Sequence, residues 1–432
     1  MSAFSQYVAA LLQADAANDV WTRPAEWLAL PALADTDDRT VILYRVEDGG
    51  YNTVALKAQG NYTVDWGDGS APENFASGVQ AEHTYTYDDA DLIASEMADG
   101  AQQAIISITP QATYSITKLE LHVRPAAAPY GYYASGIMDV AVSGPSMTTL
   151  RFGRSDAGTS VTLVDFPHLR QCSLYLPAIT DMTYLMQRLA SLRVISRWVV
   201  GTGLTSASYA FYGCTSLQSL PSGMTLAAVT NATGAFSGCA SLQSFPSGMT
   251  LAAVTNANSA FQYCSSLQSL PSGMTLAAVT NAYAAFQSCS SLQSLPSGMT
   301  LAAVTSANSA FYGCTSLRSL PSGMTLAAVT NASYAFAYCA SLQSLPSGMT
   351  LAACTTTTNA FGSCSSLQAA DGLAIPESFS IASCNFSAAA LDALYTSLPT
   401  VTGKTITVTG NPGTSGDDPS IATAKGWTVA GS

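Results

Sequence analysis

A 25-residue unit repeats seven times along this chain with little change, and the repeat limits what the chain can fold into. The copy at residues 254–278 reads VTNANSAFQYCSSLQSLPSGMTLAA, and the pattern restarts at Val279. A fixed period of this length is typical of a solenoid, in which each repeat forms one coil. Because no coil can bury its own apolar side chains, the array is stable only when neighbouring coils stack.

The apolar spacing within one copy predicts a short helix followed by a strand. Apolar side chains lie at i, i+1, i+4 and i+7 from Ala260, as on the buried stripe of a helix. Thr255 or Asn256 stands where the helix N-cap belongs. Residues 266–270 are the predicted strand, and Pro271 should end it because proline lacks an N–H.

The Phe and Cys positions of successive copies are expected to form a buried structural ladder. Its first members are Phe211, Cys214, Phe236, Cys239, Phe261, Cys264, Phe286 and Cys289. A lone cysteine every 25 residues lacks the close pairing that metal ligands require. Cys354 replaces a repeated valine, so the cysteines are expected to be small buried hydrophobes with free thiols. The sequence alone leaves open whether any of the ten cysteines pair.

The string A-F-x-x-C-[STA]-S-L-Q-S-L-P resembles the BspA-type leucine-rich repeat of bacterial and phage surface proteins. In that family, too, a short A-F-x-x-C segment precedes an L-x-x-L strand. The resemblance implies a leucine-rich-repeat solenoid of 25-residue coils with degenerate caps. Residues 137–204 are then the N-terminal cap and degenerate repeats, residues 205–368 the seven repeats, and residues 369–432 a C-terminal cap. Residues 387–398 of that cap are predicted to be helical.

Residues 35–124 have the pattern of a β-rich domain. The predicted strands are residues 40–46, 51–58, 62–66, 83–87, 103–108 and 116–123. Residues 64–70 read V-D-W-G-D-G-S and are followed by H-T-Y at residues 83–85, which resembles a PKD-type immunoglobulin-like domain. The resemblance implies a β-sandwich that serves as a spacer or binding module. Asp65 and Asp68 could cap the turn between strands, or they could hold a cation.

Residues 1–34 precede this domain and are predicted to contain an amphipathic helix at residues 4–21. The apolar segment that follows, from Trp21 to Pro31, could pack onto the next domain or dock as an anchor into a larger assembly. Residues 125–136 are a linker by composition. The predicted fold class is therefore mostly β with short helices.

The composition excludes several function classes. Charged residues make up 10% of the chain, its formal net charge is −12, and Arg318 is the single charged side chain between residues 201 and 370. We therefore expect no binding of nucleic acid or anionic membranes. No apolar run is long enough to insert into a membrane, and no secretory signal is visible. His83, His122 and His168 lie in unrelated local patterns, so we expect no enzyme, no cofactor and no metal.

The copies differ at positions equivalent to 208, 209, 212, 213 and 215, and three of these face away from the predicted apolar stripe. They collect Tyr, Ser, Asn and Gly, where a drifting helix face would collect Lys and Glu. The tyrosines are Tyr209, Tyr212, Tyr263, Tyr283, Tyr312, Tyr334 and Tyr338. This is the composition of an adaptable binding surface, and it suits sugars; drift on a solvent face is the alternative.

These features favour a non-enzymatic bacteriophage virion protein: a tail-fibre, baseplate or capsid-decorating adhesin. Its N-terminal region would attach to other virion proteins, and its solenoid would present a face for a host-surface receptor or glycan. A homo-oligomer is compatible with this setting. The alternatives are a BspA-type adhesin on a bacterial cell surface and an inert structural spacer.

Overall fold

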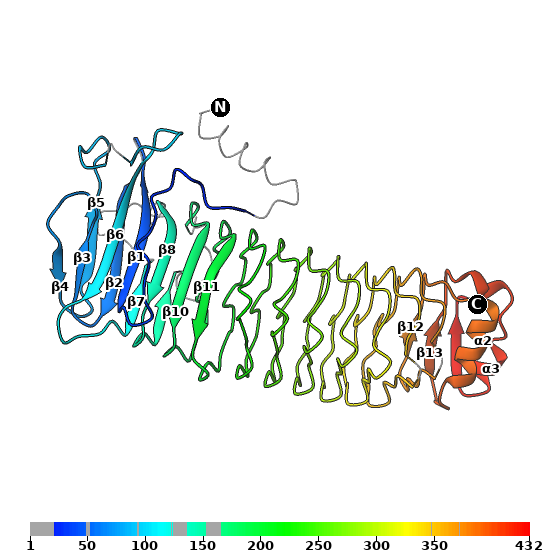
Figure 1. The fold of residues 1–432 in the computed structure, drawn as a ribbon. Coiled ribbons are helices and arrows are strands. Elements are labelled where there is room, and N and C mark those ends of the chain that lie inside the picture. The colour runs from blue at the N-terminus through cyan, green and yellow to red at the C-terminus, as the bar shows by residue number, and fades with distance from the viewer. Residues whose placement is uncertain are drawn as a thin grey trace.

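The protein is an elongated rod that begins in a β-sandwich, continues as stacked coils and ends in a small α/β cap (Figure 1). The computed structural model describes residues 21–48, 52–92, 95–121, 123, 136–152, 166–346, 348–370 and 372–432. The apolar core has no break: one cluster of buried side chains extends from Ile42 in the sandwich to Trp427 in the C-terminal cap.

Two sheets form the N-terminal sandwich. The strands are β1 (Arg39–Val46), β2 (Thr53–Gln59), β3 (Tyr62–Asp65), β4 (Glu73–Phe75), β5 (Gln80–Thr84), β6 (Gln102–Pro110), β7 (Lys118–Glu120), β8 (Ile137–Ser143), β9 (Thr149–Arg151), β10 (Gln171–Leu176) and β11 (Val194–Val200). The larger sheet has the order β11-β10-β8-β1-β6-β3-β4, and the smaller sheet has the order β5-β2-β7-β9. The sandwich is therefore closed by strands from well beyond residue 124.

The predicted strands agree with β1, β2, β3, β6 and β7 within a few residues. β5 begins three residues before the predicted strand at 83–87, and β4 was not predicted. β1 is the central strand, paired antiparallel to both β6 and β8. Seven of its eight residues are buried, which fits its nearly continuous apolar sequence RTVILYRV.

The sandwich and the solenoid share their sheets. β8 pairs antiparallel with β1 but parallel with β10, and β10 pairs parallel with β11. In the smaller sheet, β9 adds to β7 in parallel. The boundary predicted at residue 137 therefore runs through both sheets. Of the predicted linker at residues 125–136, only Gly136 is among the described residues.

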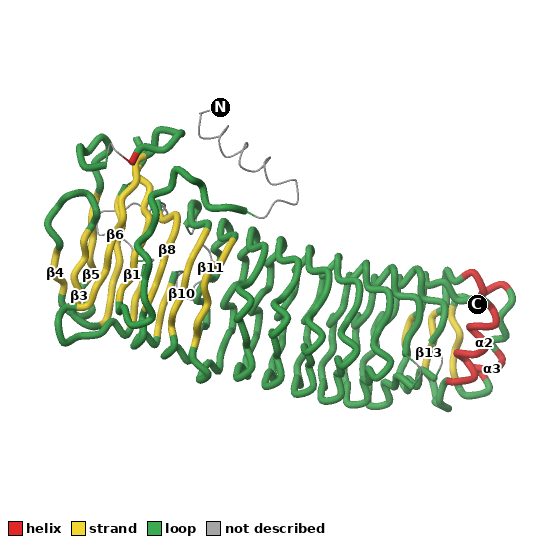
Figure 2. Tube along the Cα trace, in the orientation of Figure 1, coloured by secondary structure: helices red, strands yellow, loops and turns green. Residues whose placement is uncertain are grey.

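The coils themselves contain neither the predicted helix nor the predicted strand. Residues 254–278 are turns and irregular backbone, and the strand expected at residues 266–270 is absent. Figure 2 shows these coils as loops. Successive coils are joined by single parallel bridges such as Asn231↔Asn256 and Asn256↔Asn281, at the position expected to cap the helix. The prediction was wrong because hydrogen bonds between coils replace those of a helix.

A small α/β unit covers the last coil. β12 (Phe379–Ser380), β13 (Lys404–Thr407) and β14 (Trp427–Ala430) form a parallel sheet, beside α2 (Ala388–Ser397), the 3₁₀ turn η3 (Pro412–Ser415) and α3 (Ser420–Thr423). The helix predicted at residues 387–398 is confirmed. Ser387 is its N-cap, and the side chain accepts a hydrogen bond from the N–H of Ala390.

The N-terminal segment lies along the outer face of the larger sheet (Figure 1). Trp27, Leu28 and Leu30 pack against a small buried cluster that includes Leu43 and Met138. This favours the packing alternative for residues 21–31. The helix predicted at residues 4–21 lies, apart from its last residue, outside the described residues.

Candidate functional site

The variable positions of the repeat lie on a backbone of alternating turns. In the coil of Phe261, every second N–H donates to a carbonyl oxygen of the following coil at 2.8–3.0 Å. These groups belong to Ala257, Ser259, Phe261 and Tyr263. The N–H groups between them donate within the coil; that of Ala260, for example, donates to the carbonyl oxygen of Ala257 at 3.1 Å. Each coil thus holds the next through its backbone, whatever its variable side chains are.

Two variable positions in every coil have a left-handed backbone. The seven residues at the position of Tyr209 have φ between 50° and 58°, and those at the position of Gly213 have φ between 59° and 78°. Left-handed φ favours glycine and costs other residues about 1–2 kcal/mol. Tyr209, Tyr263, Tyr334 and Tyr338 all occupy such positions. The backbone therefore accounts for part of the Gly and Asn at these positions, but it opposes Ser and Tyr.

The seven predicted tyrosines are all at least partly exposed. Tyr263, Tyr283, Tyr334 and Tyr338 are among the most exposed large side chains of the described chain, at 52%, 46%, 39% and 46%. Tyr209, Tyr212 and Tyr312 are half-buried. We call the surface formed by these seven side chains and Tyr184 the tyrosine face.

The tyrosine face is narrower than the variable positions suggested. Ser208, Ser237 and Ser333 occupy variable positions and are buried. The position of residue 215 belongs to the contact between coils, because the hydroxyl of Thr215 donates to the carbonyl oxygen of Ala190 at 3.2 Å. Part of the variation between copies therefore lies beside or beneath the face.

The first cluster of the tyrosine face lies at its N-terminal end. The ring of Tyr209 stacks on Tyr184, with centroids 5.4 Å apart and planes at 12°, and meets Tyr212 edge-on at 5.8 Å. Gly234 makes room for this arrangement: a Cβ there would lie 2.6 Å from the Tyr209 ring. Sequence reasoning missed Tyr184, although it precedes Tyr209 by one 25-residue period.

The second cluster lies towards the C-terminal end of the solenoid. Tyr312 meets Tyr338 at a centroid distance of 5.2 Å and Tyr334 at 6.5 Å, both in edge-on geometry. Between the two clusters, one pair of amide side chains joins two neighbouring coils. The Nε2 of Gln262 donates to the Oε1 of Gln287 at 3.0 Å.

The Phe and Cys side chains stack beneath this face. Rings of successive coils, from Phe211 to Phe361, lie 5.0–5.8 Å apart and within 12° of parallel. Trp198 meets the first ring at 5.6 Å. The seven repeat cysteines, from Cys214 to Cys364, lie in the same place in their coils, and each thiol donates to a backbone carbonyl of the preceding coil; Cys264 does so to Phe236 at 3.1 Å. The ladder is a rigid apolar support for the tyrosines.

All ten cysteines are buried and free. Burial raises the pKa of the Cys214, Cys264 and Cys314 thiols to about 12. Thiols with such high pKa values remain protonated at neutral pH and are poor nucleophiles and poor metal ligands. The cysteine column is therefore structural.

The two halves of the W-G-D-G-S and H-T-Y pattern meet in the sandwich. The Nε2 of His83 lies 2.6 Å from Asp68, and its ring stacks on Trp66 at 4.9 Å. Tyr85 donates its hydroxyl to the carbonyl oxygen of Trp66 at 2.7 Å. Asp65 accepts from the N–H of Gly67, and Asp68 accepts from Ser70.

These contacts give both aspartates the turn-capping role. Burial opposes the charged form of Asp68, but hydrogen bonds from Ser70 and His83 outweigh it and lower the pKa of that carboxyl. Within the described parts of the chain, no group of three or more His, Cys, Asp or Glu could hold a metal ion.

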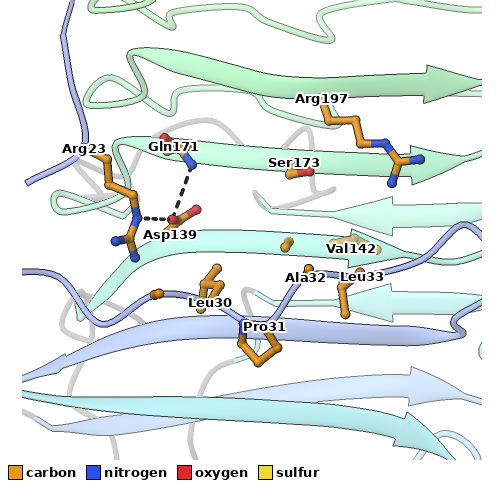
Figure 3. A pocket seen from close by; sticks show the side chains of 12 residues that line it. Arg23, Leu30, Pro31, Ala32, Leu33, Asp139, Val142, Gln171, Ser173 and Arg197 are labelled. Carbon is orange, nitrogen blue, oxygen red and sulfur yellow. Dashed lines mark hydrogen bonds and ion pairs between the residues drawn. The ribbon is translucent and has the colours of Figure 1, made fainter. Parts of the chain in front are cut away.

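A groove of about 430 Å³ lies between the N-terminal segment and strands β8, β10 and β11 (Figure 3). At its floor the buried carboxylate of Asp139 accepts from the Nε of Arg23 at 3.0 Å and from Gln171 at 3.5 Å. Burial raises the pKa of Asp139, and the bond from Arg23 opposes that rise. Arg197, at the other end, pairs with Asp35. These ion pairs fasten the N-terminal segment to the sheet.

Residues 204–317 and 282–398 match the family model described as the BspA type leucine rich repeat region (6 copies). Residues 204–398 are therefore a BspA-type leucine-rich repeat region, which is the class that the A-F-x-x-C string indicated. No curated protein matches the chain. Repeat regions of this class are generally non-enzymatic and serve in binding or as structural elements. None of the helices that the structure describes has the length and apolarity to cross a membrane.

Proposed function

We propose that this protein is a non-catalytic adhesin that recognises a receptor or glycan on a cell surface through the tyrosine face. One observation carries the proposal: large aromatic side chains are exposed at positions where the copies differ, on a solenoid that is otherwise nearly uniform. Tyrosine provides a rigid amphipathic contact area, and the small polar residues around it provide adaptable hydrogen bonds.

The backbone geometry adds support. Stability alone favours glycine at the left-handed position that Gly213 and Gly238 occupy. Tyr263 and Tyr338 occupy the same position with φ of 61° and are about half exposed. About half of each ring is exposed, and the left-handed backbone opposes tyrosine at this position. A ligand that contacts these rings would explain their presence.

More specifically, we propose that the protein is part of a bacteriophage virion, as a tail-fibre, baseplate or capsid-decorating protein. In this setting the N-terminal region attaches to other virion proteins and the solenoid projects from the particle. The support is the resemblance of residues 64–85 to a PKD-type domain beside BspA-type repeats. Mass spectrometry of purified phage particles tests it: the chain should copurify with particles. Its recovery from the bacterial cell envelope alone would favour the cell-surface adhesin.

A structural spacer is the second candidate, and the unbroken core favours it. Buried side chains are continuous from the sandwich to the C-terminal cap, so the protein is built as one stiff rod. Such a rod could hold two partners apart without binding anything along its length.

Titration of the labelled full-length chain onto whole cells of a bacterial panel, and onto a glycan array, separates these candidates. An adhesin gives saturable binding to particular cells or glycans, and free glycan competes for it. Uniformly weak binding that does not saturate on any surface would overturn the adhesin proposal and favour the spacer.

A further inference from the structure

The tyrosine face is divided into two clusters. Tyr184, Tyr209 and Tyr212 form the first, and Tyr312, Tyr334 and Tyr338 form the second. No ring–ring contact joins them among the described residues; the coils between carry Tyr263 and Tyr283 singly, beside amide side chains. Two separate aromatic platforms on one rigid support can contact two separate parts of a ligand.

The distance between the clusters follows from the coil spacing. Tyr212 and Tyr312 occupy the same place in coils that are 100 residues, or four periods, apart. Successive coils are joined by parallel bridges, so the two residues are roughly 20 Å apart at about 4.8 Å per coil. A ligand that contacts both clusters must therefore be an extended chain lying along the solenoid axis.

The charge of the face restricts the chemistry of that chain. Arg318 is the single charged side chain in residues 201–370, and two exposed residues, Asp181 and Arg188, flank the face at its N-terminal end. An acidic polymer would find no row of cations along these coils, and the net charge of −12 would repel it. A basic ligand would likewise find no row of carboxylates. The face is complementary to a neutral, hydroxyl-rich chain.

We propose that the tyrosine face binds one neutral polysaccharide chain along the solenoid axis, with the two tyrosine clusters as separate subsites for sugar rings. The clusters present flat, amphipathic rings, and the amides of Gln262 and Gln287 between them can exchange hydrogen bonds with sugar hydroxyls. This inference rests on the proposed function and narrows it from a receptor of any kind to a neutral glycan long enough to span both clusters.

Binding at two linked subsites gives a clear dependence on chain length. A disaccharide can occupy one cluster, whereas a long chain can occupy both at once. The second contact is then intramolecular, which raises affinity by on the order of 10²-fold. The probes are dextran, a soluble β-glucan and a galactomannan as neutral chains, their disaccharides, and alginate as an acidic chain. Isothermal titration with the full-length protein gives affinity and stoichiometry for each.

Two variants test the subsites one at a time: Tyr209→Ser/Tyr212→Ser and Tyr312→Ser/Tyr334→Ser/Tyr338→Ser. The control is Tyr114→Ser, because Tyr114 is 51% exposed in the N-terminal sandwich, away from the solenoid. Each cluster variant should weaken binding of a long neutral chain about tenfold or more and remove one disaccharide site, while the protein still unfolds cooperatively and is folded at the assay temperature. The control should bind like the native protein.

The outcomes separate this inference from the proposed function. Disaccharides that bind as tightly as polymers, or a preference for alginate, would overturn the two-subsite inference and leave an adhesin. Binding to cells could also be saturable and dependent on the tyrosines, yet abolished by protease treatment of the cells. That result would overturn the two-subsite inference and indicate a protein receptor. Cluster variants that bind cells and every glycan as well as the native protein would overturn both.

Discussion

The thiol of Cys264 donates a hydrogen bond to the carbonyl oxygen of Phe236, one coil earlier, at 3.1 Å. The same bond recurs along the solenoid, for example from Cys289 to Phe261 at 3.0 Å and from Cys314 to Phe286 at 3.1 Å. The carbonyl oxygen of Phe236 also accepts the N–H of Cys239 at 3.0 Å, so the thiol is a second donor to a group that is already paired. The cysteine column therefore adds a weak contact between coils at an otherwise apolar position.

The buried thiols should be unreactive in the folded protein. A thiol reagent such as DTNB at pH 8 should modify none of the ten cysteines until denaturant is added, and then all of them. The reason is burial, which excludes the reagent and raises the pKa of thiols such as Cys264 to about 12. Rapid modification of the native protein would show that the coils open locally.

The same thiols should make stability depend on alkaline pH. Burial raises the pKa of these thiols above the unfolded value of 9.0, so their contribution to the unfolding free energy is complete below pH 9 and is lost as pH rises above it. Above pH 9, each thiol lowers the unfolding free energy by about 1.4 kcal/mol per pH unit. Cys354→Val is the matched variant, since valine stands at the equivalent position in other copies. It should change stability at pH 7 by less than about 1.5 kcal/mol and make the alkaline loss shallower.

The phenylalanine stack should dominate the stability of the repeat region. Phe261 is 1% exposed and its ring lies 5.0 Å from that of Phe286, so Phe261→Ala should lower the unfolding free energy by about 3–5 kcal/mol. Phe261→Leu should cost less because it leaves a smaller cavity. Chemical denaturation followed by circular dichroism measures both. Equal, small effects would mean that the stack is not a major source of stability.

Tyr263→Gly should leave stability unchanged or raise it by up to about 1 kcal/mol. The left-handed backbone at φ 61° is strained for tyrosine but not for glycine, so the substitution removes strain from the folded protein. Glycine also has a larger conformational entropy in the unfolded chain, and this offsets part of the gain in unfolding free energy. The side chain is 52% exposed, so the burial that is lost is about half that of a core tyrosine and offsets part of the gain. A destabilisation above about 2 kcal/mol in thermal unfolding would show that this tyrosine has a packing role and would weaken the argument for a ligand.

A histidine beside the sandwich should make the protein sensitive to acid. Burial of His168, together with the nearby Arg45 cation, lowers the pKa of its imidazole from 6.5 to about 4. The contribution of the neutral imidazole to the unfolding free energy is therefore complete above pH 6.5, and on the order of 3 kcal/mol is lost as pH falls to 4. His168→Gln should reduce the loss of unfolding free energy between pH 7 and pH 4.5. If the variant loses as much unfolding free energy between pH 7 and pH 4.5 as the native protein does, His168 is not the source of the acid sensitivity.

The period of the repeat predicted the solenoid and its buried columns, but the conformation of the coil could not be derived from apolar spacing alone. Spacing at i, i+1, i+4 and i+7 places Phe261 and Cys264 on one side of a helix, and the observed turns bury the same two residues. The signal against a helix was glycine at two variable positions four residues apart, as at Gly234 and Gly238, which have positive φ.

Exposure of the tyrosines could be predicted from variation between copies, but their clustering could not. Tyr209 and Tyr212 meet because the chain reverses between them in a tight turn, and Tyr312 meets Tyr338 across neighbouring coils. Likewise, the sandwich and the solenoid are joined by β8, which pairs with β1 on one side and with β10 on the other. Both the tyrosine clusters and this junction depend on contacts between residues that are distant in the sequence.

The most direct test is a titration of the native chain and the variant Tyr263→Ser/Tyr283→Ser/Tyr334→Ser/Tyr338→Ser onto bacterial cells or glycans that bind the native chain. These four side chains are the most exposed of the tyrosine face, and their loss should leave the fold intact. We expect saturable binding by the native protein and by Tyr114→Ser, and binding at least about tenfold weaker in the fourfold variant, which keeps only the first cluster intact. Undiminished binding by a correctly folded fourfold variant would contradict this expectation.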